Sequence, residues 1–151
     1  MSLLPDLLAP ERILLDVAAA SKQALYEVVG QRLAETLKVS AKTITASLLA
    51  REKLGSTGLG QGVAIPHGRI KGLKQATGCF LRLKEPISFG APDNQPVSLV
   101  FVLLVPEQAT ELHLRILSEL ASRLGDKAFR DQLAQLADPV AIHRLFIHAP
   151  D

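Results

Sequence analysis

One stretch of the sequence, from Val97 to Val105, constrains the fold more than any other. It reads VSLVFVLLV, which is almost entirely apolar and rich in β-branched residues. A strand that is covered on both faces has such a continuous apolar run, whereas a half-exposed strand alternates apolar and polar residues. We therefore expect a central strand here, ended by Pro106, with other elements packed against both faces of its sheet.

The rest of the chain predicts further strands and, on either side of them in the sequence, helices. Strands are expected at Arg12–Val17, on a sheet edge, and at Val63–Ile65 and Thr77–Leu83, the last followed by a loop from Pro86 to Pro96. Helices should begin after residues that cap helix N-termini: Ser21, Ser40, Thr110, Asp126 and Asp138. With no repeat or linker, this order predicts an α/β sandwich of a single domain, residues 1–151, with a mixed sheet flanked by helices.

Composition and charge exclude several classes of function. The chain has 151 residues, a net charge of +2, no cluster of basic residues, five Phe, one Tyr and no Trp. It therefore lacks the basic surface and the aromatic platforms that are typical of nucleic-acid binding. Its single cysteine, Cys79, opens an apolar stretch, so we expect a buried side chain and a reducing compartment. No apolar run has membrane-spanning length and no signal peptide is apparent, so we expect a cytoplasmic protein without membrane insertion.

A glycine-rich stretch from Gly55 to Arg69 is the strongest candidate for a functional site. It reads GSTGLGQGVAIPHGR, in which glycines precede a short apolar run and Pro66 separates that run from His67. Glycines permit positive φ angles and a close approach of the backbone to a ligand, and a proline ends a strand because it has no N–H to donate. His67 is thus expected at a strand end, either as an ordinary loop residue or as a neutral nucleophile near pH 7.

Three further side chains are candidates for the same site. His113 should lie in the first turn of its helix, on the core-facing side, either as an ordinary core histidine or as part of an anion site at a helix N-terminus. Arg51 precedes the glycine-rich stretch, and Arg69 follows His67 by two residues. Each arginine is either a solvated surface residue or a forked donor to phosphate oxygens. Together these residues suit phosphoryl transfer through a phosphohistidine, which depends on positioning and charge stabilisation.

Other catalytic and binding motifs do not occur in the sequence. The histidines and the cysteine have no metal-ligand spacing, and there is no GxSxG element of a serine hydrolase. The glycine-rich stretch runs from a helix into a strand and has no Lys-Ser/Thr pair, unlike a P-loop or a dinucleotide fingerprint. We therefore expect neither a metal nor a cofactor. His143 and His148, near the C-terminus, are expected to be surface residues.

The residues around His67 resemble a known family. The segment from Arg51 to Arg69, REKLGSTGLGQGVAIPHGR, closely resembles the signature of enzyme IIA domains of the bacterial phosphotransferase system, of the mannitol/fructose type. Later segments are similar to the same family in the same order: DNQPV (Asp93 to Val97), LLVP (Leu103 to Pro106) and HLRILSELA (His113 to Ala121). The resemblance is clear over residues 45–125 and looser at both ends.

The resemblance implies both a fold and a reaction. It implies a mixed five-stranded sheet flanked by helices, and a His67 that accepts a phosphoryl group from a phosphorylated HPr-type carrier protein. In the family, the group is attached to the ring nitrogen farther from the backbone. By position, His113 matches the second active-site histidine of the family, Arg51 matches its phosphate-facing arginine, and Arg69 occupies a basic position after the motif.

The resemblance leaves more than one role open. A free-standing domain with GSTG in its loop, and with DNQPV, is most like the nitrogen-regulatory IIA proteins, whose phosphorylation state would regulate target proteins such as kinases and transporters. A sugar-specific IIA that passes the group to a separate IIB would share the chemistry. A regulatory binding module that no longer transfers phosphate would share the fold, although it would have no chemical need for His67, His113 and Arg51 together.

Overall fold

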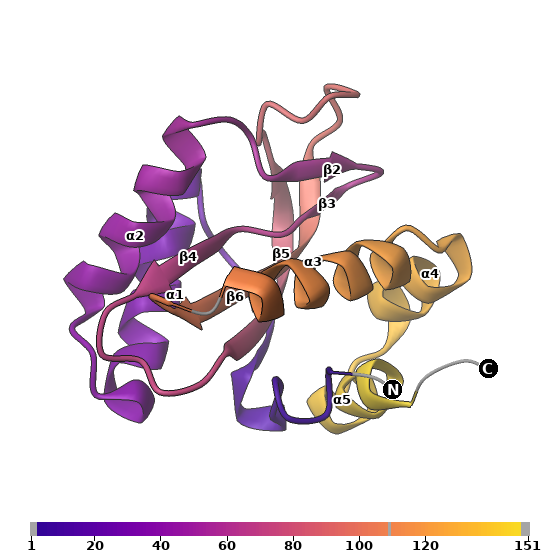
Figure 1. Ribbon diagram of the computed structural model, residues 1–151. Helices are drawn as coiled ribbons and strands as arrows, with labels where there is room; N and C mark the ends of the chain where they lie inside the picture. The colour runs from indigo at the N-terminus through magenta and orange to yellow at the C-terminus, as the bar shows by residue number, and fades with distance from the viewer. Residues whose placement is uncertain (1–2, 109, 149–151) are drawn as a thin grey trace.

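The computed structural model describes residues 3–108 and 110–148 of the chain. A central sheet stands between two groups of helices (Figure 1), which confirms the expected α/β class. No helix in this described part is long and apolar enough to cross a membrane. The elements are η1 (Pro10–Arg12), β1 (Ile13–Val17), α1 (Lys22–Leu37), α2 (Ala41–Lys53), β2 (Gly58–Gly60), β3 (Val63–Ala64), β4 (His67–Ile70), β5 (Thr77–Ile87), β6 (Val97–Pro106), α3 (Thr110–Leu124), α4 (Lys127–Gln135) and α5 (Pro139–Ile147).

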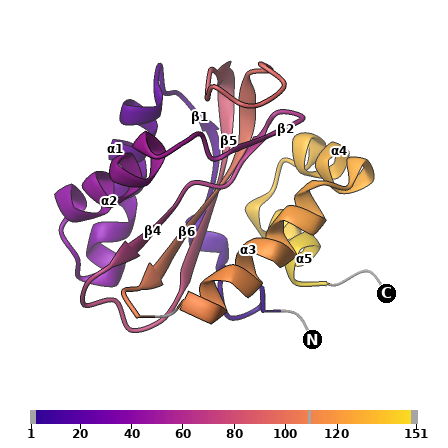
Figure 2. The ribbon, with the colours of Figure 1, turned by 45° about the horizontal axis from the view of Figure 1, so that its top comes forward.

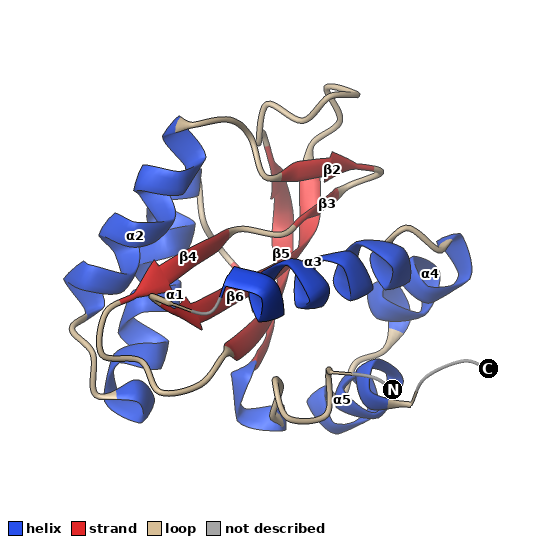
Figure 3. Cartoon of the chain, in the orientation of Figure 1, coloured by secondary structure: helices blue, strands red, loops and turns tan. Residues whose placement is uncertain are grey.

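The sheet is mixed, and the apolar strand predicted to be central is central. β6 pairs antiparallel with β5 and parallel with β3 and β4 (Figure 3). β1 pairs with the far side of β5. The described residues form a six-stranded sheet, not the five-stranded one that the resemblance implied. Part of the glycine-rich stretch is itself extended, because Gly58–Gly60 pairs with β3 as a short edge strand.

The two faces of the sheet are covered by different helices. α1 and α2 pack on one face and α3, α4 and α5 on the other, as Figure 2 shows. Side chains of β6 alternate between the two cores: Leu103 and Val105 point toward α3 and its neighbours, and Val102 and Leu104 toward α1 and α2. This alternation follows from the two-residue period of a strand, and it explains why the sequence of β6 is apolar throughout.

β3 and β4 form one line of chain beside β6, interrupted once. Val63 lies opposite Leu99 and His67 opposite Leu103, so the register is the same on both sides of the interruption. The interruption includes Pro66, which has no N–H for the ladder, although its carbonyl accepts a hydrogen bond of 2.9 Å from the Leu103 N–H. His67, expected at a strand end, is the first residue of a further strand that was not expected, β4, because the chain after the proline rejoins the sheet.

The predicted helix caps are confirmed wherever the structure describes them. Each of the capping side chains accepts a hydrogen bond from a backbone N–H in the first turn of its helix: Ser21, Ser40, Asp126 and Asp138. The expected cap at Thr110 differs, since Thr110 is already the first residue of α3 and the preceding position lies outside the described residues.

The N-terminal segment before β1 belongs to the core, which its sequence did not indicate. Leu4, Leu7 and Leu8 are buried against the helices of the α3 side. Nε2 of His143 lies 3.0 Å from the Leu8 carbonyl oxygen, so His143 is half-buried and the expectation of a surface residue is wrong. His148 is exposed, as expected. The expectation of a buried cysteine is also confirmed, because no part of the thiol side chain is accessible.

Candidate active site

His67 is held in one tautomer by the backbone of Ile65, in the interruption between β3 and β4. Its Nδ1 lies 2.9 Å from the carbonyl oxygen of Ile65. A carbonyl oxygen only accepts hydrogen bonds, so Nδ1 carries the proton, and in the neutral ring Nε2 then carries an available lone pair. Since residues alternate along β3 and β4, the ring of His67 lies on the α3 side of the sheet, as Ile65 does. The nitrogen farther from the backbone is thus the unprotonated one.

Arg51, near the C-terminal end of α2, reaches this nitrogen. Its Nε donates to Nε2 of His67 over 3.2 Å, and its Nη1 donates to the Gly55 carbonyl over 2.9 Å. Within residues 3–108 and 110–148, Nη2 has no hydrogen-bond partner. The guanidinium is therefore fixed by two of its nitrogens, and the third can donate to an anion such as a phosphoryl group.

His113 faces His67 from α3. The centroids of the two rings are 5.0 Å apart, and the rings meet edge to face at 72°. His113 is only 8% exposed, and its Nε2 is buried without a hydrogen-bond partner in the described part of the protein. A buried polar atom without a partner costs about 1–3 kcal/mol, so this nitrogen is the natural partner of a group that arrives from outside.

Both rings are kept neutral at pH 7. Burial lowers the pKa of His67 below its usual 6.5, and the positive charge of Arg51 lowers it further, although the Ile65 carbonyl and the charge of Glu52 act in the opposite direction. The pKa of His113 is likewise lowered, first by burial and then by His67, Arg69 and Arg51. A neutral ring is the form of histidine that can act as a nucleophile.

A cavity of about 190 Å³ opens beside these side chains. We call it the His67 cavity, and its lining residues are Arg51, Ser56, Thr57, Gly58, Leu59, Ile65, His67, Leu117 and Ala121. The glycine-rich loop supplies one wall and α3 the other. The turn between β2 and β3 needs glycine at both ends, because Gly60 and Gly62 have φ angles of 94° and 79°. The glycines thus serve the local backbone geometry that the sequence indicated.

Arg69 lies at the rim of this arrangement. It shares a face of β4 with His67 by alternation, but it is exposed, and its charge is one cause of the lowered pKa of His113. The structure therefore brings His67, His113 and Arg51 together and leaves Arg69 at the edge. Gly68, between Arg69 and His67, allows β4 to lie against α2, where any larger residue would collide with Ser47.

One buried acidic residue of the site was not found from the sequence. The carboxylate of Glu52 accepts hydrogen bonds from Lys22 and Tyr26 of α1 and from Thr57 of the loop. Burial alone would raise the pKa of Glu52, but the hydrogen bonds from Thr57, Tyr26 and Lys22 outweigh burial and lower it. Glu52 follows Arg51 directly in an exposed-looking run, Arg51-Glu52-Lys53, and no local pattern distinguishes it from a surface residue.

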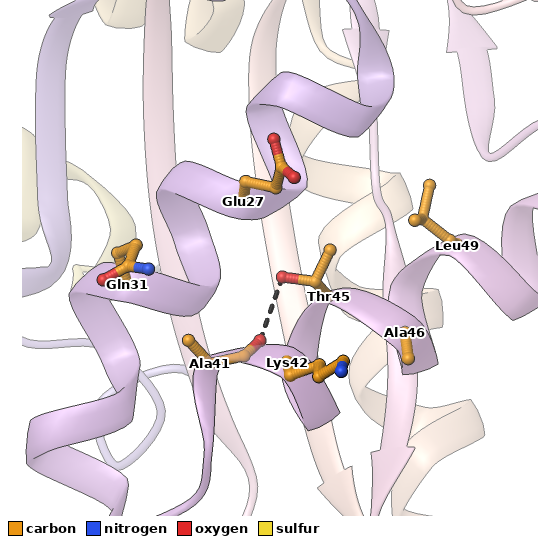
Figure 4. Close-up of a pocket in the computed structure, with 7 residues that line it drawn as sticks. All are labelled: Glu27, Gln31, Ala41, Lys42, Thr45, Ala46 and Leu49. Carbon is orange, nitrogen blue, oxygen red and sulfur yellow. Dashed lines mark hydrogen bonds between the residues drawn. The ribbon is translucent and has the colours of Figure 1, made fainter.

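A second hollow, larger than the first, lies between α1 and α2, on the face of the sheet opposite to α3. It has a volume of about 550 Å³ and is shown in Figure 4; we call it the α1–α2 groove, and its lining residues are Glu27, Gln31, Ala41, Lys42, Thr45, Ala46 and Leu49. It contains no histidine or arginine. The hydroxyl of Thr45 is already bonded to the carbonyls of Ala41 and Tyr26.

A histidine, an arginine and a second histidine meet where α2, β4 and α3 of an α/β sandwich come together, and such a set of groups is chemically suited to hold a phosphoryl group. The sequence matches the family "Phosphoenolpyruvate-dependent sugar phosphotransferase system, EIIA 2" over residues 6–149, and the chain belongs to this family of phosphotransfer components. The resemblance noted from the sequence is thereby confirmed.

The individual relatives point mainly to one branch of the family. A nitrogen regulatory protein of Pseudomonas aeruginosa is 41% identical over 145 residues, which cover 95% of this chain and 94% of that protein. The crystal structure of the nitrogen regulatory protein IIA-Ntr from Neisseria meningitidis has a TM-score of 0.92 at 48% identity, with coverage of 96% and 99%. The mannitol IIA enzyme of Escherichia coli, solved in complex with phosphorylated mannitol IIB, has a TM-score of 0.78 at 25% identity, with coverage of 92% and 96%.

Proposed function

We propose that the chain, acting as a single cytoplasmic domain, is a phosphohistidine carrier of the phosphotransferase system. His67 accepts a phosphoryl group from a phosphorylated HPr-type protein. The observation that carries this proposal is one contact: the unprotonated Nε2 of His67 accepts a hydrogen bond from the Arg51 guanidinium. The ring of His113, whose Nε2 has no partner among the described residues, lies against the ring of His67.

The transfer is a displacement at phosphorus. Nε of Arg51 first releases Nε2 of His67, to which it donates in the unphosphorylated protein. The lone pair on Nε2 then forms a new N–P bond, the bond between phosphorus and the donor breaks, and its electron pair leaves with the donor. The proton on Nδ1 stays in its hydrogen bond to the Ile65 carbonyl, which supports the positive charge that develops on the ring. Arg51 and His113 stabilise the charge on the transferred oxygens. Arg69, at the rim, adds a positive charge to the approach path.

The surroundings of the cavity favour a protein as the donor. Three exposed leucines lie on the elements that border it: Leu54 is 84% exposed, Leu59 is 47% exposed and Leu114 is 66% exposed. Leu114 lies one turn before Leu117 on α3, and Leu59 lines the cavity itself. Exposed apolar side chains around a polar site are typical of a docking surface.

We assign the chain to the nitrogen-regulatory branch, because the relatives with high identity over most of the chain are nitrogen regulatory proteins. Phosphorylation adds about two negative charges at the surface, and the phosphorylated and unphosphorylated forms would bind different target proteins such as kinases or transporters. The second candidate is a sugar-specific IIA that passes the group to a separate IIB. The observation in its favour is the structural similarity to the mannitol enzyme, which was solved with its phosphorylated IIB.

The test is phosphoryl uptake measured by intact mass. The chain is incubated with phosphoenolpyruvate, enzyme I and an HPr-type carrier from either the nitrogen or the sugar branch. We expect a single acid-labile phosphoryl group, and none on the variant His67→Ala. If neither carrier labels the chain, the carrier function is wrong and the binding module becomes the better explanation. Transfer from the labelled chain to a IIB protein would favour the sugar-specific role.

A further inference from the structure

The buried carboxylate of Glu52 is bonded on both of its oxygens. Oε1 accepts from the hydroxyl of Tyr26 at 2.8 Å and from the hydroxyl of Thr57 at 2.7 Å. Oε2 accepts from Nζ of Lys22 at 3.1 Å and from the backbone N–H of Thr57 at 3.0 Å. The Glu52 side chain is only 6% exposed. An ionised group is buried to this extent only when its partners compensate for the lost hydration.

These bonds continue from Glu52 to the reactive ring. The carbonyl of Thr57, whose N–H is held by Glu52, accepts a hydrogen bond of 3.0 Å from the N–H of Ile65. The carbonyl of Ile65 in turn accepts the proton of His67 Nδ1 at 2.9 Å. The path from Glu52 to His67 therefore consists of three hydrogen bonds that are joined through the backbones of Thr57 and Ile65, and the last of them determines which ring nitrogen carries the proton.

Glu52 also acts on Arg51, its neighbour in α2. The backbone carbonyl of Glu52 accepts from the Gly55 N–H, and the carbonyl of Gly55 accepts from Nη1 of Arg51 at 2.9 Å. The loop that Glu52 anchors through Thr57 is thus the same loop that orients the guanidinium. The side chain of Glu52, through Thr57, and its backbone carbonyl, through Gly55, thus hold both sides of the contact between Arg51 and His67.

We propose that Glu52 is a positioning residue for phosphoryl transfer, which keeps His67 in its Nδ1-protonated tautomer through the Thr57–Ile65 backbone and keeps Arg51 aligned with Nε2. This inference rests on the proposed function of His67. The carboxylate is needed for its acceptors and not only for its shape. A glutamine in its place has an NH₂ group instead of one oxygen. Turned toward Lys22 and the Thr57 N–H, that group would face two obligatory donors; turned toward the hydroxyls of Tyr26 and Thr57, it would force both hydroxyls to accept, and the negative charge opposite Lys22 is lost in either case.

The decisive test is the variant Glu52→Gln in the full chain, with Glu35→Gln as a matched control on the exposed face of α1. Nitrogen-15 NMR of labelled histidine reports the tautomer and the pKa of His67, and intact mass reports the rate of phosphoryl uptake. For Glu52→Gln we expect a mixture of ring tautomers and a roughly 10- to 100-fold slower uptake. The control should match the unmodified chain in both measurements.

The pKa of His67 gives an independent readout. The charged and titratable groups around this ring are Arg51 and Glu52 from α2, His113 from α3 and Arg69 on β4 itself. Removing the negative charge of Glu52 leaves the positive groups unopposed, so the pKa of His67 should fall further. A merely structural role for Glu52 would slow uptake without changing the tautomer, and that result would overturn the proposal. An uptake rate within twofold of the unmodified chain would do the same.

A second variant covers the case in which Glu52→Gln does not fold. Tyr26→Phe keeps the carboxylate and the ring packing but removes one donor to Oε1. We expect a smaller change in the same direction, a few-fold slower uptake together with a detectable second tautomer, and the absence of both would overturn the proposal. If the unmodified chain takes up no phosphoryl group, the proposed function fails, while the tautomer measurements still decide whether Glu52 positions His67.

Discussion

The His67 cavity and the α1–α2 groove differ in size and, more importantly, in chemistry. The groove is the larger, at about 550 Å³ against about 190 Å³. Its charged residues, Glu27 and Lys42, are of opposite sign, and the hydroxyl of Thr45 is occupied by carbonyl oxygens. At the cavity, by contrast, Nη2 of Arg51 has no hydrogen-bond partner among the described residues, and neither has Nε2 of His113, whose ring contacts the lining residue His67.

This difference shows what identifies a site for a small anion. A phosphoryl group needs donors that are already oriented and not yet satisfied, because donors that reorganise or exchange partners during the reaction contribute less. Such donors occur where elements distant in sequence meet, here the end of α2, the start of β4 and the first turn of α3. The volume of a hollow does not show whether its donors are oriented for an anion.

The largest difference in phosphoryl uptake is expected between two variants, each of which removes one positive charge from one of the two hollows. Arg51→Ala should slow phosphoryl uptake by roughly 10³-fold, the lower end of the range for arginines that stabilise a transferring phosphoryl group. Lys42→Ala, in the α1–α2 groove, should change the rate by less than about twofold. Single-turnover uptake from a phosphorylated HPr-type carrier measures both. A comparable loss for the two variants would mean that overall charge, and not the geometry around His67, controls transfer.

Removal of the second histidine should have the next largest effect. His113→Ala should cost about 2–4 kcal/mol of transition-state stabilisation, as expected for the loss of one oriented donor. The fold should be retained, because Nε2 of His113 has no hydrogen-bond partner within the described residues that the change could break. The measurement is the rate of uptake together with a circular-dichroism melting curve. Near-normal uptake would exclude a role for His113 in the transfer.

Lowering the pH should protonate His67 and so affect the His67 cavity first, because no histidine lines the α1–α2 groove. Because the pKa of His67 lies below its usual 6.5, uptake should stay constant as the pH falls through 6.5 and then decrease about tenfold per pH unit below the lowered pKa. The unfolded chain, with the higher pKa, binds protons first, so the free energy of unfolding should also decrease as the pH falls below 6.5. Loss of uptake beginning above pH 7 would contradict a lowered pKa.

Most of the architecture could be predicted because it depends on local patterns. The apolar run of β6, the caps at Ser21 and Ser40 and the proline after β3 each act over a few residues. The features that were missed depend on pairing between distant segments. The chain after Pro66 becomes a strand only because β6 is there to receive it, and the N-terminal leucines are buried only because the α3 side has room for them.

The residues of the candidate site also divide into those that a local pattern indicates and those that depend on distant partners. His67, Arg51 and His113 could be selected because their residue types and their places in a family pattern are unusual, and the structure brings them together. Glu52 could not, because its importance comes from partners on α1 and in the loop that no local spacing indicates. Arg69 was selected for its charge, and its exposure at the rim became visible only once β4 was placed.

The smallest expected effect on phosphoryl uptake comes from a larger side chain in the α1–α2 groove. The same substitution in the His67 cavity serves as the comparison. Ala46 and Ala121 are both exposed alanines on helices, and each lines one of the two hollows. Ala46→Leu should leave phosphoryl uptake within twofold and the free energy of unfolding within about 0.5 kcal/mol, as for most surface changes. Ala121→Leu adds the same side chain beside His67 and should slow uptake roughly tenfold, because it occupies space that the phosphoryl group requires. Equal rates for the two variants would show that the cavity is not the entrance for the transferred group, and a strong effect of Ala46→Leu alone would transfer the functional assignment to the groove.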